Sequence, residues 1–377
     1  MNTQPLVSVV LPCRNEQPAL AQCLTQIKQV LQQNNINGEI IVSDSSTDSS
    51  PDIAKQFGVV LVKHNQDGYG AAYLQGFKAA QGRYLFLADC DGTYDFSEIP
   101  NFIDYLNQGF DFVIGNRLNG KIAPKAMPFL HRYFGSPLLS LIFRLLFWYK
   151  VKDINCGMRA ITKSGLEKIN LKTTGMEFAS EMLIKAVRQN LKIRQVTINY
   201  NQRLGKSKLK PLADGWRHLR FMLLYSPWFL FLLPGLIFFI LGLALMLALY
   251  FNWLAIFSLK LYYHPMFFAS VSIIIGYQLI IFSAFAKTYA ISHLGETSPL
   301  LNKLHQYLTI EKASLLGLLF GLAGTVIFFV IFWHWYQSGF GALAEIKNLI
   351  LAQTLIVIGV QTIFSSFMLS ILGIKEK

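Results

Sequence analysis

The stretch Tyr84-Leu85-Phe86-Leu87-Ala88-Asp89-Cys90-Asp91-Gly92-Thr93 decides the fold of this chain. Its first four residues are apolar or aromatic and predict a buried strand. Two carboxylates, separated by one residue, follow at the end of that strand. In an extended backbone residues i and i+2 point the same way, so we expect Asp89 and Asp91 to converge on one ligand. Hard divalent cations prefer oxygen ligands, and the pair therefore predicts a site for Mg²⁺ or Mn²⁺.

The pattern around this stretch alternates between strand and helix. An Asp-x-Asp tripeptide occurs about once by chance in a chain of this length, so its meaning comes from its surroundings. The alternation predicts an α/β, Rossmann-like fold, with a mostly parallel sheet and helices on both faces. The expected strands lie at 6–11, 39–42, 59–62, 84–87 and 111–114, and helical patterns cover 18–33, a segment opened by Pro51, and a segment ending near Ala80.

Polar clusters follow four successive predicted strands. In parallel sheets ligands bind beyond the carboxyl ends of the strands, so we expect the clusters to share one crevice. Each cluster alone also fits a helix cap or a turn, because Ser, Asp, Thr and Gly favour both. The clusters occupy 12–16, 43–50, 64–72 and 89–93.

The second part of the chain has a different composition. Residues 1–228 carry 27 of the 34 Lys and Arg residues and 17 of the 21 acids, while 229–377 carry only 7 and 4. About 20 helical residues cross a bilayer, and four apolar runs are long enough, so we expect four transmembrane helices rather than buried soluble ones. The runs are 229–251, 265–286, 314–333 and 346–373.

Basic residues orient these spans. Cytosolic loops carry an excess of Lys and Arg, so we expect the N-terminal domain, the 287–313 loop and the C-terminus on the cytosolic side. The chain is then a multi-pass integral membrane protein. The residues that carry this inference are Lys287, Lys303, Lys312, Lys375 and Lys377.

The motif set resembles family 2 glycosyltransferases with the GT-A fold over about residues 5–225. The matching segments are Pro12-x-x-Asn15-Glu16, Asp44-x-x-Thr47-Asp48, Gly68-x-Gly70-x-Ala72 and Asp89-x-Asp91. Ser43 departs from the pattern, since many relatives carry an acid there. The resemblance implies that Asp89 and Asp91 hold the metal on the donor diphosphate. It places in the nucleotide-sugar pocket Pro12, Arg14, Glu16, Asp44, Asp67, Gly68, Asp89, Cys90 and Asp91.

The middle of the domain is similar to polyprenyl-phosphate hexose synthases, the dolichol-phosphate mannose and glucose type. This resemblance implies transfer from UDP-glucose or GDP-mannose to a polyprenyl or dolichyl phosphate, with inversion at the sugar carbon. The residues assigned to chemistry are Asp89, Asp91, Arg117 and Asp153, and those assigned to the acceptor phosphate are Arg117, Arg132, Arg203, Ser207 and Lys208.

Three of these assignments keep an alternative. Lysines near 206–210 could attract anionic lipid headgroups without contacting the acceptor. Asp153 could orient the donor or the metal, or could be only a turn acid before Asn155. The apolar segment 137–148 could form an interfacial helix at the lipid side of the site, or a core helix.

The expected organisation is a GT-A domain over 1–210, an amphipathic juxtamembrane helix over 211–228 and four membrane helices over 229–377. The expected partners are a nucleotide sugar, a polyprenyl phosphate and the bilayer, and no nucleic acid. The chain could also form a homo-oligomer. A processive polysaccharide synthase is an alternative, although the Gln-x-x-Arg-Trp segment of those enzymes is missing from the sequence. A glycolipid-flipping or binding protein with a degenerate transferase domain is another.

Overall fold

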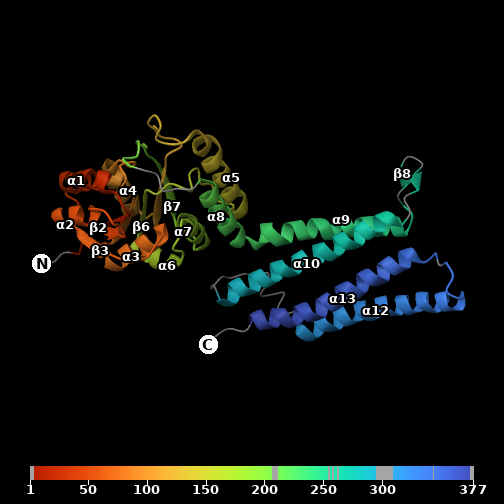
Figure 1. Ribbon diagram of the computed structural model, residues 1–377. Coiled ribbons are helices and arrows are strands. Elements are labelled where there is room, and N and C mark those ends of the chain that lie inside the picture. Colours follow the sequence, from red (N-terminus) through yellow and green to blue (C-terminus); the bar gives the residue numbers. More distant parts are fainter. Residues whose placement is uncertain are drawn as a thin grey trace. The chain divides into compact units, whose positions relative to one another are not determined.

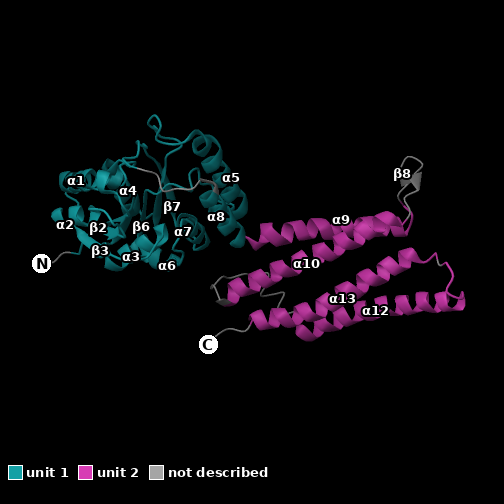
Figure 2. Cartoon of the chain, viewed as in Figure 1, with its two compact units in different colours: residues 1–225 teal, residues 226–377 magenta. Residues whose placement is uncertain are grey.

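The computed structural model describes residues 4–205, 211–253, 255–256, 259–260, 263–293, 309–342 and 344–373. The chain forms two compact units, Met1–Tyr225 and Ser226–Lys377, coloured teal and magenta in Figure 2. Of the lysines used to orient the spans, Lys303, Lys375 and Lys377 lie outside the described residues.

A seven-stranded sheet forms the centre of the first unit, in the order β3-β2-β1-β4-β6-β5-β7 (Figure 1). All its pairings are parallel except those of β6, which runs antiparallel to β4 and β5. The prediction of a mostly parallel α/β sheet is therefore confirmed. The strands are β1 Val7–Cys13, β2 Gly38–Asp44, β3 Val60–Lys63, β4 Tyr84–Leu87, β5 Phe112–Asn116, β6 Arg159–Thr162 and β7 Ile193–Thr197.

Strand register brings the polar clusters to one edge of the sheet. Cys13 at the end of β1 pairs with Asp44 at the end of β2, and Asp44 pairs with Lys63 at the end of β3. On the other side of β1, Val10 pairs with Leu87, the last residue of β4. The segments that follow these four strands therefore start from neighbouring positions.

Helices cover the sheet as the alternating pattern predicts. Helix α3 packs on β1 and β2, whereas α4 packs on β4, β5 and β6, and α1 contacts α2 and the short helix η1. The helices of this unit are α1 Gln17–Gln33, α2 Ser50–Gln56, α3 Tyr69–Ala79, η1 Phe96–Glu98, α4 Ile99–Asn107, η2 His131–Gly135, α5 Ser136–Phe147, α6 Lys163–Ile169, α7 Phe178–Arg188 and α8 Pro211–Leu224.

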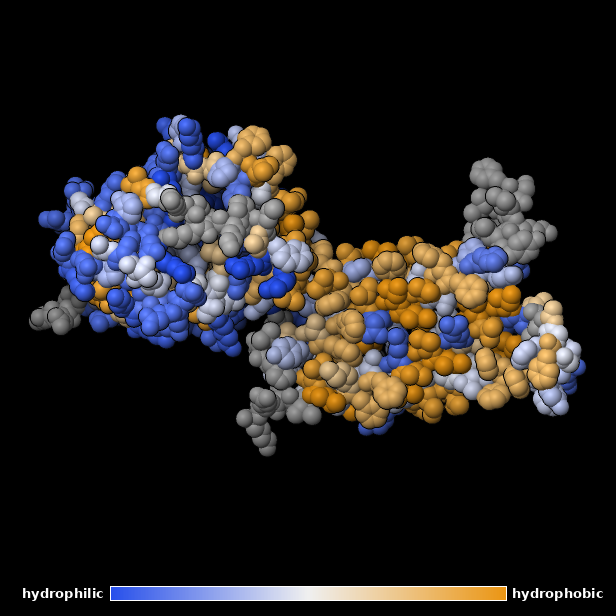
Figure 3. All heavy atoms as spheres, viewed as in Figure 1, coloured by the Kyte–Doolittle hydropathy of each residue, from blue (hydrophilic) through white to orange (hydrophobic). Residues whose placement is uncertain are grey.

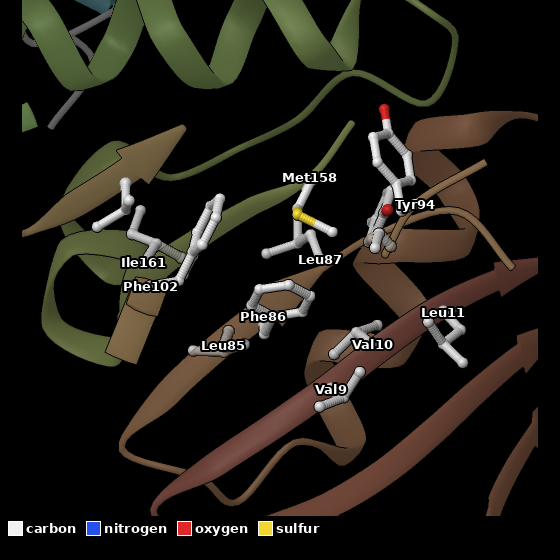
Figure 4. Packing of buried hydrophobic residues seen from close by; sticks show 14 of the residues in the cluster. Val9, Val10, Leu11, Leu85, Phe86, Leu87, Tyr94, Phe102, Met158 and Ile161 are labelled. Atoms are coloured by element: carbon white, nitrogen blue, oxygen red, sulfur yellow. The ribbon is translucent and has the colours of Figure 1, made fainter. Parts of the chain in front are cut away.

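Strand β4 is buried on both faces, which explains its continuous apolar run. The ring of Phe86 is fully buried and meets Phe102 of α4 edge to face, with the ring centroids 5.4 Å apart. Figure 4 shows Phe86 among the buried side chains of this cluster. Leu87 lines the opposite face with Tyr73 and Phe178, whose rings stack at 5.2 Å.

We predict that Phe86→Ala lowers the free energy of unfolding of the first unit by about 3–5 kcal/mol, because the lost ring leaves a cavity. Thermal or denaturant unfolding of the full chain in detergent measures the change. Val60→Ala is the control, since Val60 is 43% exposed, and it should change stability by less than about 1 kcal/mol. Equal losses for the two variants would contradict this description of the core.

Helix α8 carries a buried histidine. His218 is 6% exposed, and its Nδ1 lies 2.8 Å from Oγ of Ser180 on α7. Burial, together with the charge of Arg159, lowers the pKa of His218 to about 4. The neutral imidazole is therefore the form that packs between α8 and α7.

This burial predicts a pH dependence of stability. The unfolded chain takes up a proton at His218 near pH 6.5, whereas the folded chain resists it until about pH 4, so acid favours unfolding across that interval. We expect the melting temperature of the wild type to fall more steeply between pH 6.5 and 4.5 than that of His218→Gln. Parallel pH profiles would show that His218 does not titrate on unfolding.

Within the described residues of the second unit, four long apolar helices confirm the prediction of four spans. Their most apolar windows have mean hydropathies between 1.9 and 2.7, and Figure 3 shows their hydrophobic surface in orange. The principal contacts join α9 to α10, α10 to α13 and α13 to α12. The elements are η3 Trp228–Leu232, α9 Leu233–Tyr250, β8 Ala255–Ile256, β9 Leu259–Lys260, α10 His264–His293, α12 Ile310–Gln337 and α13 Ile346–Gly373.

Candidate active site

The two carboxylates after β4 are brought together by a turn. The strand ends at Leu87, and Gly92 adopts a φ of +84° that favours glycine. Asp91 Oδ1 accepts hydrogen bonds from the Thr93 amide at 3.0 Å and the Thr93 hydroxyl at 2.5 Å. We expected strand alternation to point the two acids the same way. Instead, the strand ends before them, and Asp91 lies in a turn that its own side chain caps.

Asp89 lies in a narrow, partly exposed position. The Tyr69 hydroxyl forms a hydrogen bond with its carboxylate. A Cβ on Gly157 would lie 3.0 Å from Asp89 Oδ2 and equally close to the hydroxyls of Tyr69 and Tyr94, so only glycine fits there without displacement. Burial, and then the neighbouring charge of Asp91, raise the pKa of Asp89 to about 7. The two carboxylates therefore lie close enough to repel each other.

Arg203 connects this turn to a segment that is distant in sequence. Its Nη1 lies 3.0 Å from Asp91 Oδ2 and its Nη2 lies 2.6 Å from Glu16 Oε1. The amide of Leu204 donates to the Asp91 carbonyl at 2.9 Å, and its side chain packs on Gly92. One guanidinium therefore joins the cluster after β1 to the cluster after β4.

A second arginine is fixed by a buried acid. Arg117, which follows β5, donates to Asp153 through Nε at 2.8 Å and Nη2 at 2.9 Å. Asp153 is fully buried, Arg117 is 8% exposed, and the guanidinium lies 5.1 Å from the centre of the Tyr200 ring. Asp153 also accepts from the Asn155 amide at 3.3 Å, so it forms a turn while it orients Arg117. The charges of Arg203 and Arg117 both lower the pKa of Asp89. Contacts connect Arg117 to this acid, because Tyr200 packs on Tyr94, whose hydroxyl lies near Asp89 Oδ2.

Arg159 supports the loop that carries Gly157. This fully buried side chain donates to the carbonyls of Cys156, Ile154 and Ala179 at 2.7–2.8 Å. Burial lowers the pKa of its guanidinium, and neighbouring tyrosines oppose that effect. The three bonds fix the loop between Asp153 and Gly157 against α7.

Asp44 ends β2 as a fully buried acid. Neither of its carboxylate oxygens has a hydrogen-bond partner among the described residues. Beside it, the turn after β1 is fixed by Asn15, whose φ is +52° and whose Oδ1 accepts from the Thr47 amide at 2.8 Å. A buried acceptor without a donor is costly, so Asp44 is prepared for a ligand that supplies N–H or O–H groups.

The other residues assigned to the nucleotide pocket lie around this edge. The Sγ of Cys90 donates to the Pro12 carbonyl at 3.2 Å, which links β1 to the turn after β4. Arg14 and Asp67 form an exposed ion pair at 3.0 Å. Gly68 has a φ of +124°, and a Cβ there would lie 2.2 Å from the Thr174 carbonyl oxygen.

The structure does not connect every assigned residue to this cluster. Arg132 lies on η2 with its guanidinium over the Tyr133 ring, and no contact of the described residues joins it to Asp89 or Asp91. Ser207 and Lys208 lie outside the described residues, as do Lys206 and Lys210. Cys13, Cys23, Cys90 and Cys156 are buried and unpaired.

Sequence reasoning missed five residues around the carboxylates: Tyr69, Tyr94, Gly157, Arg159 and Tyr200. The Tyr94 hydroxyl accepts from the Gly157 amide at 2.7 Å, and the ring packs on Tyr200 at 5.6 Å. Tyr69 stands inside the Gly68-x-Gly70 motif, and Gly157 and Arg159 follow Asp153 within six residues. No spacing rule assigns aromatic residues to such a site, so only the fold shows them.

Comparison with known proteins gives matches along both units. Residues 8–169 match the family described as Glycosyl transferase family 2, and residues 284–373 match the Glycosyltransferase family 2 C-terminal transmembrane region. The low-salt glycan biosynthesis hexosyltransferase Agl6 of Haloferax volcanii is 35% identical over 98% of this chain and 89% of its own length. A dolichyl-phosphate hexose transferase of the same organism is 30% identical over 55% of this chain and 89% of its own length.

Among solved structures, the chain is similar to glucosyl-3-phosphoglycerate synthase from Mycobacterium tuberculosis in complex with Mn²⁺, uridine diphosphate and glucosyl-3-phosphoglycerate. That similarity has 20% sequence identity and a TM-score of 0.47, and covers 59% of this chain and 80% of the other. The identity and coverage of the Haloferax hexosyltransferase, with the two matched regions, establish the family. This chain belongs to glycosyltransferase family 2 and is an integral membrane glycosyltransferase.

Proposed function

We propose that this enzyme transfers a hexose from a nucleoside-diphosphate sugar to a polyprenyl phosphate. The observation that carries the proposal is the convergence of Asp89 and Asp91 with Arg117 and Arg203 in a chain that has four membrane spans. Such a site offers separate groups for a cation and for phosphates. The names of the two Haloferax relatives, a hexosyltransferase and a dolichyl-phosphate hexose transferase, support the same reaction.

The residues fit a divalent cation that is shared with the donor diphosphate. Mg²⁺ is usually held by one or two carboxylates together with substrate phosphates, and Mn²⁺ accepts the same oxygen ligands. Within the described ranges no group of three or more His, Cys, Asp or Glu residues could hold a metal, so the protein alone supplies an incomplete set. Burial, and then the charge of Asp91, raise the pKa of Asp89, and a cation beside it would favour the ionised carboxylate. When bound, the metal would offset charge on the leaving diphosphate.

Asp44 supports recognition of the nucleoside. Its buried oxygens lack donors among the described residues, and both uracil and guanine carry ring N–H groups that could supply them. The base of either a UDP sugar or a GDP sugar could therefore donate a hydrogen bond to Asp44. The choice between UDP-glucose and GDP-mannose rests on other contacts in the pocket.

The acceptor chemistry explains the fixed arginines. The second pKa of a phosphate monoester is about 6, so the nucleophilic oxygen is already ionised at pH 7 and needs no general base. A phosphate oxygen would bond to sugar C1 while the C1–O bond to the diphosphate breaks, and the leaving nucleoside diphosphate takes the electron pair. Asp153 occupies Nε and Nη2 of Arg117 and holds the guanidinium in a fixed orientation, which leaves its other N–H groups to donate to a phosphate. We assign Arg132, Ser207 and Lys208 to the same acceptor phosphate.

Helix α5 supports a lipid acceptor. It buries Ser140 and Phe143 against the unit, while Leu138, Leu141 and Leu145 on its other side are each at least 50% exposed. Neither alternative for the 137–148 segment is complete, because the helix has both a core face and a free apolar face. We propose that the free face lies in the bilayer surface, with the first unit and the C-terminus on the cytosolic side.

Two other functions remain as alternatives to test. A processive synthase would elongate a polysaccharide, and a degenerate transferase domain would bind or move glycolipid without forming it. The intact pair of acids after β4 and the fixed Arg117 favour chemistry over binding alone.

We predict that purified enzyme with Mg²⁺ or Mn²⁺, a radiolabelled UDP- or GDP-hexose and polyprenyl phosphate forms a product that extracts into organic solvent. Asp91→Asn should lower the rate at least about a hundredfold, because it removes charge from the cation site. Asp52→Asn is the control, since Asp52 is an exposed acid in α2. Full activity in chelator would refute the metal assignment, and a water-soluble polymer would favour the synthase.

The α5 assignment predicts a separable effect. Leu141→Gln with Leu145→Gln should raise the KM for a long-chain polyprenyl phosphate severalfold while the KM for the nucleotide sugar stays unchanged, because only the lipid side is altered. Val60→Gln is a matched control on the exposed edge strand β3. Unchanged lipid kinetics, with normal folding, would exclude this face from acceptor binding.

A further inference from the structure

A buried acid on α7 anchors the 172–175 loop beside the active site. Glu181 is 1% exposed, and the reaction proposed for this enzyme gives it no role. The Lys172 amide donates to its Oε1 at 3.0 Å, while the amide and hydroxyl of Thr173 donate to its Oε2 at 2.8 and 2.6 Å. Lys185 Nζ lies 2.6 Å from Oε1. All of these groups are donors, so an ionised carboxylate is the acceptor that suits this position.

The anchored loop bonds to the first turn of α3 through the backbone. The Gly70 amide donates to the Gly175 carbonyl at 3.2 Å, and the Ala71 amide donates to the Thr174 carbonyl at 3.0 Å. Glycine permits this approach, because a Cβ on Gly70 would lie 2.3 Å from the Thr173 carbonyl oxygen. The first amides of a helix lack partners within that helix. Here the loop supplies the partners, so it fixes the position of the first turn of α3.

This turn carries Tyr69, the residue that bonds to one of the two acids after β4. The Tyr69 hydroxyl forms a hydrogen bond with the Asp89 carboxylate. The ring of Tyr69 packs edge to face on Phe178 of α7, with the ring centroids 6.2 Å apart. Helix α7 therefore holds Tyr69 in two ways, by a ring contact and, through the loop, by the backbone of the next residue.

The contacts of Glu181 are concentrated on one short segment. A buried carboxylate is unfavourable unless several donors surround it. At Glu181 two amides and a hydroxyl from the loop do so, and Lys185 completes the set. Lys185 also donates to the Asn170 carbonyl at 2.6 Å, just before the loop. The acid and the lysine together hold this segment against α7 in one position, which suits a loop that locates a group in the active site.

We propose that Glu181 is a positioning residue of the transferase, which holds the 172–175 loop so that the first turn of α3 places Tyr69 against Asp89. The link from Tyr69 to the reaction rests on the proposed function, since there Asp89 binds the cation. The placement of α3 by Glu181 does not depend on that assignment. Gly70 serves the site by admitting the loop, and Tyr69 is the residue of this turn that reaches the acids.

Hydrogen exchange of the full chain in detergent tests the placement of α3, by mass spectrometry of peptides that cover 68–75. Glu181→Gln should speed exchange of the Gly70 and Ala71 amides at least about tenfold, because either orientation of the glutamine amide turns its NH₂ group toward a donor of the loop. Thr173→Val removes one hydroxyl donor and keeps the carboxylate, so it should speed exchange about threefold.

Ser180→Ala is the matched control. Ser180 is fully buried on the same helix, and its hydroxyl lies 2.8 Å from Nδ1 of His218 on α8. This variant removes a buried hydrogen bond of α7 and leaves the loop anchored, so exchange over 68–75 should stay as in the wild type. Unchanged exchange in Glu181→Gln and Thr173→Val, or equal acceleration by Ser180→Ala, would overturn the proposal.

A double-mutant cycle tests the link from Glu181 to Asp89. Its readout is the affinity for Mn²⁺ in the presence of UDP or GDP, measured by electron paramagnetic resonance. Tyr69→Phe and Glu181→Gln should each weaken Mn²⁺ binding about threefold to tenfold. The double variant should bind no more weakly than Tyr69→Phe, because Glu181 acts through the hydroxyl that this variant lacks. Losses that multiply would show independent effects and would overturn the link.

The positioning role and the proposed function fail in different ways. A wild type that binds no Mn²⁺ with either nucleotide would refute the cation site, and the exchange result would then decide the role of Glu181 by itself. Faster exchange in Glu181→Gln with unchanged Mn²⁺ affinity would show that the loop supports only the fold, which would overturn the positioning role.

Discussion

The burial of Asp89 near the charge of Asp91 is the constraint on which the rest of the site depends. Two acids held side by side at a sheet edge are unfavourable unless positive charge lies near them. The fold supplies Arg203, which also binds Glu16, and Arg117, which Asp153 holds in place. These two arginines lie 86 residues apart in the chain. The site therefore exists only when the whole first unit is folded.

In the proposed reaction, this arrangement of acids and arginines favours a divalent cation and an anionic acceptor. A cation placed between acids and a diphosphate lowers the cost of bringing a second anion into the same cleft. Fixed guanidinium groups then offer that second anion a defined position. The proposed phosphate acceptor would carry its own ionised nucleophile, so the enzyme would supply positioning and charge rather than a base. Membrane spans and the free face of α5 favour an acceptor that is a lipid.

The sequence predicts the architecture well because burial and periodicity are local signals. The apolar run of β4, the polar clusters after successive strands and the four long spans all come from short-range patterns. The turn at Asp91, the position of Tyr200 over Arg117 and the three carbonyls around Arg159 depend on contacts between distant segments, which no periodicity encodes. Asp153 shows what the sequence does not determine, because the sequence leaves two roles open for it. Its hydrogen bonds to Arg117 and Asn155 show that this one side chain contributes to both an ion pair and a turn.

The central claim is that the acids after β4 and a nucleoside diphosphate share one divalent cation. Electron paramagnetic resonance of free Mn²⁺, titrated with enzyme in the presence and absence of UDP or GDP, tests it most directly. Because the described residues bring no three candidate ligands together, we predict weak Mn²⁺ binding to the enzyme alone. With the matching nucleotide present, we predict Mn²⁺ binding at least about tenfold tighter than that of the nucleotide without enzyme. Mn²⁺ binding that is unaffected by either nucleotide, or that is unchanged in Asp89→Asn, would contradict the account.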